Sequence, residues 1–365
     1  MQVTKQILEK IERYKKFYKS DKGGLMVLTS YPIQTGIALT VDTEVVEVTP
    51  LDKVDWQDEM SIRSYAKGCI EEFKRSIKHM SLIEDDSIPT IQVLAGTGMI
   101  GATFVKNPIL THEKDTNYLE VPIKNWEDGI DNICFNPNNQ YYKAQMIILR
   151  SFIKEWDGSF SILPFTHFDP LDLCNQFRGN DIFYDFYEEP ENLHKLLEKV
   201  TNAIIELEDY TRKHFMDGYN LEGTGMWCWL PGGNYLSCDI GDMSSPEIIR
   251  EFDRPYFDRI VEHWGGAFLH HHELGIHQID TWAESKKLTV QFLNRDPNTR
   301  HLAETMDDKI IEASLKLPIN FIATYKEFSE NAEKWAEGKF IVFVDCNNEE
   351  EVKEVIRRTE KLRNC

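Results

Sequence analysis

Short hydrophobic runs alternate with helical patterns through the last third of the chain, and this alternation constrains the fold more than any other feature. The runs are rich in β-branched and aromatic residues and cover 235–238, 267–270, 288–293, 319–323 and 340–344. Amphipathic stretches separate them, as expected for βα units that share a parallel sheet. Consecutive units of this length predict an α/β fold of the TIM (β/α)8 barrel type, with its active site at the strand ends and in the loops that follow.

The preceding part of the chain carries weaker signals of the same kind. Further strand patterns cover 25–31, 88–94, 160–163 and 225–229. Pro190 and the sequence Ser245-Pro246-Glu247 mark helix starts, because serine caps a helix and proline fits its first turn. The helix after Ser245 is expected to reach residue 263. We expect a single domain over residues 1–365, in which residues 1–87 form an N-terminal helical elaboration that includes the first strand.

The chain is strongly acidic, with 41 Lys and Arg residues against 61 Asp and Glu residues and a formal net charge of −20. This charge repels phosphate backbones and anionic membrane surfaces, so neither nucleic acid nor a membrane is an expected partner. No hydrophobic run approaches the ~20 residues of a bilayer span, and the N-terminus has the pattern of a charged amphipathic helix rather than an export signal. We expect a cytoplasmic protein that acts on a small molecule.

The segment from Phe268 to His277, Phe-Leu-His-His-His-Glu-Leu-Gly-Ile-His, contains the densest group of reactive side chains. It ends a predicted strand, on which alternate residues face the same side. His270 and His272 are therefore expected to point into one site, and His271 to point away from it. His277 follows in the next loop, where we predict a catalytic role.

Two of the seven cysteines also end predicted strands: Cys238 lies on the strand before the histidines and Cys346 on the last one. There is no CxxC pair, so the cysteines suggest thiols or metal ligands rather than a disulfide framework. In a parallel barrel all strand ends meet at one rim. Cys238 and Cys346 with His270 and His272 would suit zinc, with an open position if three of them bind. A metal-free polar cleft, with the cysteines as small buried residues, is the alternative.

Charged residues near the predicted strand ends form a second set of candidates. Asp239 directly follows Cys238 and is a candidate general acid or base. His167 and Asp169, in Thr-His-Phe-Asp-Pro, are candidates for substrate binding, although Asp169 also suits a helix cap before proline. Arg178 is a candidate anchor for a substrate carboxylate, with an ordinary ion pair as the alternative.

The aromatic residues Trp229 and Tyr235 bracket the sequence Leu-Pro-Gly-Gly-Asn and would line the mouth of a barrel with apolar walls, although core packing alone could also explain them. A separate motif, Gly96-Thr-Gly-Met-Ile-Gly101, matches the GxGxxG pattern of dinucleotide-binding loops. Pro108 follows too soon for a long helix to present its N-terminus to a pyrophosphate. We interpret this motif as a loop in which the glycines adopt positive φ.

Three stretches carry a resemblance to a known family. They are Asp169-Pro-Leu-Asp-Leu-Cys-Asn-Gln-Phe-Arg-Gly-Asn-Asp181, Tyr187-Glu-Glu-Pro-Glu-Asn-Leu-His-Lys-Leu-Leu197 and Cys238-Asp-Ile-Gly-Asp-Met-Ser-Ser-Pro-Glu-Ile-Ile-Arg-Glu-Phe252. The chain from about residue 126 onward resembles the uroporphyrinogen decarboxylase-like superfamily. The resemblance implies a TIM barrel and either tetrapyrrole decarboxylation or zinc-dependent methyl transfer between a corrinoid and a thiol.

Departures from the two patterns favour one branch. The decarboxylases carry an arginine-containing loop after the first strand, whereas this chain has Thr29-Ser-Tyr-Pro-Ile-Gln-Thr-Gly36. The zinc methyltransferases carry a His-x-Cys and a late cysteine. Here His270 keeps its place, His272 replaces the thiolate, and Cys346 lies in Val-Asp-Cys-Asn rather than in a glycine-rich setting.

The resemblance therefore implies a zinc-dependent methyltransferase that moves a methyl group to a thiol from a small donor or from a corrinoid carried by a partner protein. The first alternative is a metal-free decarboxylase of a tetrapyrrole or smaller acid, with Asp239 and the histidines as acid and base and Arg178 as anchor. The second is a barrel that holds a corrinoid or another flat ligand without catalysis.

Overall fold

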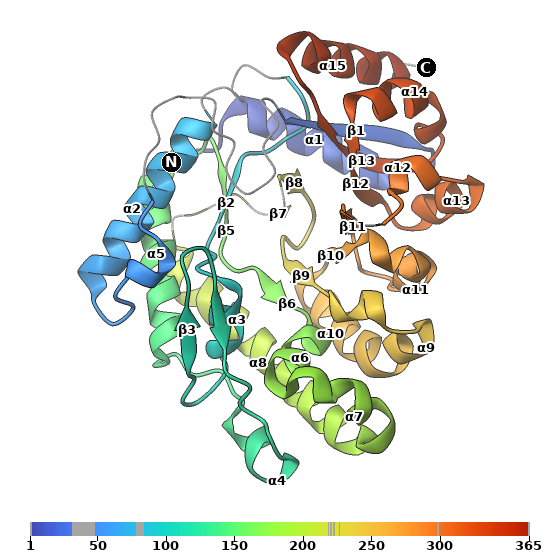
Figure 1. The fold of residues 1–365 in the computed structure, drawn as a ribbon. Coiled ribbons are helices and arrows are strands. Elements are labelled where there is room, and N and C mark those ends of the chain that lie inside the picture. The colour runs from blue at the N-terminus through green and yellow to red at the C-terminus, as the bar shows by residue number, and fades with distance from the viewer. Residues whose placement is uncertain are drawn as a thin grey trace.

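The computed structural model describes residues 2–30, 48–77, 84–217, 219, 221, 223–225, 227–297 and 299–363. It is an α/β protein whose described residues include a parallel sheet of seven strands (Figure 1). In sheet order these are β1 (Gly24–Ser30), β13 (Lys339–Asp345), β12 (Ile319–Thr324), β11 (Val290–Asn294), β10 (Phe268–His272), β9 (Tyr235–Ser237) and β6 (His167–Phe168). Every neighbouring pair is parallel, as the βα period predicts.

Shorter strand pairs complete the strand inventory of the described residues. β2 (Thr90–Gln92) pairs in parallel with β5 (Ser161–Leu163), which precedes β6 in the chain. β3 (Leu110–His112) and β4 (Asn117–Leu119) form an antiparallel hairpin. β7 (Thr224–Gly225) and β8 (Cys228–Trp229) form another. The expectation of one strand over 225–229 is therefore wrong: Trp227 has a positive φ of 70°, and the chain turns there instead of extending.

The helices coloured orange and red, from the last third of the chain, lie above or to the right of strands β1, β13, β12 and β11 in Figure 1. The described helices are α1 (Lys5–Lys19), α2 (Glu59–Ser76), α3 (Thr97–Ala102), α4 (Trp126–Gly129), α5 (Gln140–Glu155), α6 (Pro170–Arg178), α7 (Ile182–Glu188), α8 (Pro190–Phe215), α9 (Pro246–Ile248), α10 (Arg254–Trp264), α11 (Ile279–Trp282), α12 (Leu302–Thr305), α13 (Asp308–Lys316), α14 (Tyr325–Trp335) and α15 (Glu349–Arg363). None of these described helices is both long and apolar enough to cross a membrane.

The strand β13 shows why the sheet is buried on both faces. Phe340, Val342 and Val344 pack in one hydrophobic cluster, with residues of α13, α14 and α15, while Ile341 packs in the other, larger cluster. Successive side chains of a strand point to opposite faces. A strand that is covered on both faces has the nearly continuous hydrophobic sequence that made β13 predictable.

The predicted helix 245–263 is interrupted. Ser245 caps α9, as expected, and its hydroxyl accepts the amide of Ile248. A π-helical turn over Ile249–Asp253 then separates α9 from α10. Pro255 lies in the first turn of α10 and has no amide hydrogen to continue the regular ladder. The extra residue in this turn places Asp253 in the protein interior, where it is fully buried.

Two aspartates take the place of a strand neighbour beside β1. Among the described residues no strand ladder joins β1 to β2. Instead, Asp86 accepts the amide of Val27 at 2.8 Å and donates its own amide to the carbonyl of Val27 at 2.9 Å. Asp85 accepts the amide of Thr29 at 2.8 Å. We call this contact the β1 junction. Residues 31–36 of the loop after β1, in which the sequence lacks an arginine, lie outside the described residues.

Candidate metal centre

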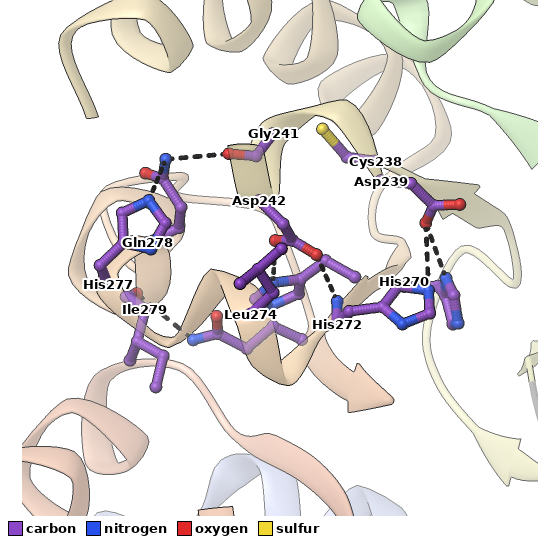
Figure 2. A network of polar contacts seen from close by, with 12 residues as sticks. Cys238, Asp239, Gly241, Asp242, His270, His272, Leu274, His277, Gln278 and Ile279 are labelled. Atoms are coloured by element: carbon purple, nitrogen blue, oxygen red, sulfur yellow. Dashed lines mark hydrogen bonds and ion pairs between the residues drawn. The ribbon is translucent and has the colours of Figure 1, made fainter. Parts of the chain in front are cut away.

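Asp239, His270 and His272 come together where β9 and β10 end. Each offers a ligand atom within 4.8 Å of the others. Oδ1 of Asp239 lies 3.6 Å from Nδ1 of His270 and 3.5 Å from Nε2 of His272. Figure 2 shows the carboxylate facing both rings. The side chains of Asp239 and His272 are 50% and 28% exposed, so this group, the His–Asp centre, can be reached from solvent.

Strand alternation explains which residues face the centre. β9 and β10 pair in parallel with Ser237 opposite His270. The hydroxyl of Ser237 lies 3.0 Å from Nδ1 of His270 and donates to Asp239 at 3.1 Å. Since neighbouring residues of an extended chain face opposite sides, Cys238 between them points away. His270 and His272 share a side, and their rings pack edge to face with 5.0 Å between centroids.

The electrostatics of the centre suit metal ligation. Burial lowers the pKa of His270, although Asp239 opposes this effect, so the ring is neutral at neutral pH. For Asp239 burial acts to raise the pKa, but His270, His272 and Ser237 together outweigh it and lower the pKa of the carboxyl. A metal needs imidazole in its neutral form and carboxylate in its ionised form. Both groups are therefore in the state that binds.

His272 is held by two aspartates from neighbouring loops. Its Nδ1 lies 2.8 Å from Oδ1 of Asp296, in the loop after β11, and its amide donates to Asp242 at 2.6 Å. His271 points to the other side, as predicted: it is fully buried and its Nδ1 lies 3.1 Å from Asp242. Asp242 thus joins the backbone of His272 to the ring of His271.

Aromatic rings form the wall behind His270. The ring of Tyr235 stacks against His270 with 5.8 Å between centroids, and Phe292 of β11 lies 5.5 Å away on a tilted plane. Tyr235 is buried, and burial raises the pKa of its hydroxyl well above the ordinary value. Tyr235 therefore lies in the site as a neutral apolar wall.

The structure separates Cys238 from the histidines. Its thiol is fully buried and donates to Asp253 at 3.2 Å, and it groups with the buried carboxyls of Asp169 and Asp172. Burial, followed by the nearby carboxyls, raises the pKa of the thiol well above its ordinary value. The sulfur of Cys238 therefore faces these buried carboxyls and not His270 or His272. The place expected for Cys238 beside the histidines is taken by its neighbour Asp239, because the register of β9 against β10 turns the odd-numbered side chains inward.

Asp169 caps a helix, which the sequence indicated as the alternative to substrate binding. It caps α6 by accepting the amide of Asp172 at 2.8 Å. Asp172 in turn accepts the amides of Asp239 and Ile240, both at 2.8 Å. The buried carboxyl of Asp172 thus fixes the backbone that carries Asp239.

The other predicted site residues lie apart from the centre. Arg178 is saturated: its guanidinium pairs with Asp185 at 2.8 and 3.1 Å and donates to two backbone carbonyls, so it is not available as a substrate anchor. Cys346 is buried at the end of β13, and burial raises the pKa of its thiol to about 12. His277 lies 3.0 Å from the carbonyl of Ser244.

His167 and Trp229 are also held by other parts of the fold. His167 is buried in β6, 3.5 Å from Glu208, and stacks on Trp264. Trp229 lies on β8, where its carbonyl accepts the hydroxyl of Tyr18 from α1. Neither belongs to the His–Asp centre.

The sequence reasoning missed Ser237 and Asp296. Asp296 stands two residues after the last residue of β11, as Asp239 stands two residues after the last residue of β9. Alternation places both positions on the side of the last strand residue. Asp296 stands three residues beyond the predicted strand 288–293, so a search for polar residues one to three positions beyond each predicted strand would have found it.

The GxGxxG segment forms the six-residue helix α3. Only Gly96 has a positive φ, of 88°, so the expectation for the other glycines is wrong. A side chain at Gly98 would overlap the backbone of β4, so that glycine permits close packing. A cavity of about 470 Å³ lies beside this segment, between α2, β2 and the β3–β4 hairpin, and none of its lining residues belongs to the His–Asp centre.

Comparison with known proteins gives a fold likeness. The sequence matches no family model and no curated protein. Solved structures do match, among them a methyltransferase from Methanosarcina mazei, with a TM-score of 0.59 and 10% sequence identity over 96% of this chain and 98% of that chain. At this identity the likeness concerns the fold. This chain and that methyltransferase therefore share a fold.

Proposed function

We propose that this chain is a metal-dependent methyltransferase of the uroporphyrinogen decarboxylase-like superfamily, and that Asp239, His270 and His272 hold a zinc ion. Two imidazoles and one carboxylate are a donor set that catalytic zinc uses, with a further position left for water or substrate. One observation carries the proposal: the ionised carboxylate of Asp239 and the neutral ring of His270 lie together with His272. They meet at a solvent-accessible strand end, in a fold like that of a known methyltransferase.

Zinc in such a site would lower the pKa of a substrate thiol and so supply a thiolate at neutral pH. The sulfur–carbon bond would form as the bond from the methyl group to its donor breaks, and the electron pair of that bond would remain with the donor. The donor is a methylated corrinoid on a partner protein or a small methyl compound. The residues of this chain orient the ligands: Asp172 holds Asp239, and the wall of Tyr235 and Phe292 keeps water from one side of His270.

We also infer that the strands close into an eight-stranded barrel. β1, β2, β5 together with β6, and β9 to β13 supply eight positions in the order of that fold. The backbone and carboxylate contacts of the β1 junction support the closure between β1 and the segment before β2.

The proposal is tested by counting zinc and by measuring thiol methylation. Wild-type protein reconstituted with zinc should retain about one ion per chain, and His272→Ala should lose it together with transfer from methylcobalamin to a thiol, because removing one of three ligands opens the site. His263→Ala is the matched control, since His263 also pairs with an aspartate but lies on the surface of α10. Wild-type protein that retains no zinc would contradict the proposal, and one that retains iron would change the reaction class.

A further inference from the structure

The carboxylate of Asp296 binds His272 with one oxygen and Leu274 with the other. Oδ1 lies 2.8 Å from Nδ1 of the ring, and Oδ2 accepts the amide of Leu274 at 3.0 Å. Asp296 comes from the loop after β11, whereas His272 and Leu274 belong to β10 and the turn that follows. One side chain from the neighbouring strand therefore fixes both the ring of His272 and the backbone next to it.

This contact determines which ring nitrogen is free. A neutral imidazole has one N–H, and an ionised carboxylate can only accept a hydrogen bond. Nδ1 must therefore carry the hydrogen that faces Asp296, which leaves the lone pair on Nε2. Nε2 is the nitrogen that faces Asp239, at 3.5 Å.

His270 lacks such a constraint. Its Nδ1 faces the hydroxyl of Ser237 at 3.0 Å. A hydroxyl has one hydrogen: while Ser237 donates it to Asp239 at 3.1 Å, Nδ1 of His270 must be the donor, and Nδ1 accepts only if the hydroxyl turns its hydrogen toward the ring. The two histidines of the centre thus differ: the tautomer of His270 follows the orientation of a hydroxyl hydrogen, whereas that of His272 follows a carboxylate that can only accept.

We propose that Asp296 is a positioning residue that sets the tautomer and the ring orientation of His272, so that Nε2 faces the His–Asp centre ready to bind. The effect on metal affinity rests on the proposed zinc site, but the tautomer of His272 does not. Carboxylates that orient metal-binding histidines usually change metal affinity by about 10- to 100-fold when they are removed.

The first readout is the tautomer in the zinc-free protein. With ¹⁵N-labelled histidine at about pH 8.5, where free imidazole is neutral, the NMR signals of His272 should show hydrogen on Nδ1. In Asp296→Ala they should show a mixture or hydrogen on Nε2. Asp296→Asn keeps one acceptor oxygen for the two donors, Nδ1 of His272 and the amide of Leu274. Its signals should lie between those of the wild type and of Asp296→Ala. Asp209→Ala, which removes the partner of the surface residue His263, should leave the His272 signals unchanged.

The second readout is zinc affinity, measured by competition with a chromophoric chelator. Asp296→Ala should bind zinc about 10- to 100-fold more weakly than wild type, and Asp209→Ala should bind as wild type does. Hydrogen on Nε2 of His272 in the wild type would overturn the proposal, and so would unchanged zinc affinity in Asp296→Ala. A wild type that binds no zinc but shows the tautomer shift would support the positioning role and refute the proposed metal function.

Discussion

Two groups of buried aspartates in this protein differ in how their charge is balanced. Asp85 and Asp86 form the β1 junction, and both are almost completely buried. Asp169, Asp172 and Asp253 lie behind the His–Asp centre together with Cys238 and are also buried; we call them the acid cluster. The first group is surrounded by basic side chains and the second by acids.

At the β1 junction every carboxylate has a cation. Nζ of Lys10 lies 3.6 Å from Asp85, Arg13 donates to Asp86 at 2.9 Å, and Arg363 of α15 also contacts Asp86. The remaining oxygens accept backbone amides of β1. These charges are paired and hydrogen-bonded, as buried charges must be if they are to remain ionised.

In the acid cluster, by contrast, the charged neighbours are other acids. Burial and then the proximity of Asp253 raise the pKa of Asp169 well above its ordinary value, and burial raises the pKa of Asp253 to about 7. One oxygen of Asp169 and one of Asp253 are buried without an N–H donor, and the two carboxyls can bond to each other only when one of them holds a proton. Within the described part of the chain, no ion pair joins this cluster to a lysine or arginine. Burial alone therefore does not tell how a carboxyl behaves: its neighbours decide between a structural charge and a bound proton.

The largest expected effect on stability comes from removing one of the paired carboxylates of the β1 junction. Asp86→Ala should lower the free energy of unfolding by about 3 to 5 kcal/mol, because it removes the partner of Arg13 and Arg363 and leaves the amide of Val27 without an acceptor. Urea denaturation followed by circular dichroism measures this loss. Asp131→Ala, at an exposed pair with Lys199, should change stability by less than about 1 kcal/mol. Equal effects of the two variants would mean that the junction charges are not important for stability.

A smaller effect should appear in the pH dependence set by the acid cluster. The pKa of Asp253 is about 7 in the folded protein against 3.8 as the ordinary value. Below pH 3.8 the carboxyl of Asp253 is protonated in both the folded and the unfolded protein. Between pH 3.8 and about 7 only the folded protein keeps this proton, so the free energy of unfolding falls as pH rises through this range. Above pH about 7 the stabilisation that the bound proton provides is gone.

Asp253→Asn should remove this dependence, since an amide can donate to Asp169 and accept from Cys238 without titrating. We expect the variant to be more stable than wild type at pH 8 by about 2 kcal/mol and to lose less stability than wild type between pH 5 and pH 8. Urea denaturation at each pH provides the measurement. A wild-type stability that rises with pH through this range, with a parallel curve for the variant, would argue against a shared proton in the cluster.

The smallest effect is expected at Cys238. Its thiol contacts the acid cluster, and the next residue, Asp239, belongs to the His–Asp centre. Cys238→Ser keeps a donor for Asp253 and should cost about 1 kcal/mol or less. The zinc content should remain that of wild type, because the thiol points into the acid cluster and not toward His270 or His272. Elemental analysis of the purified variant measures this content. If Cys238→Ser alone lost its zinc, the thiol of Cys238 would be a metal ligand. The side chains of β9 would then face the opposite sides from those described above.

The sequence predicted more of the fold than of the site, for a physical reason. Hydrophobic period and helix caps are local, so β13, α8 and the start of α9 could be located from residue order alone. The pairing of His270 and His272 followed from alternation within one strand. The replacement of Cys238 by Asp239 depended on the register between two strands, and a shift of one residue exchanges the side chains that face the site. The ion pair of Arg178 depended on how α6 packs against α7.

The position of β13 between β1 and β12 also has a consequence for the order of folding. β1 pairs with β13 from Gly24 opposite Lys339 to Ser30 opposite Asp345, and Asp86 contacts Arg363. During synthesis the edge of β1 that pairs with β13 therefore stays uncovered until almost the entire described chain has been made. Contacts between such distant segments slow folding, and an unpaired strand edge invites association with other chains. We expect refolding yield to depend on protein concentration, and the appearance of β1–β13 contacts to be the slow step.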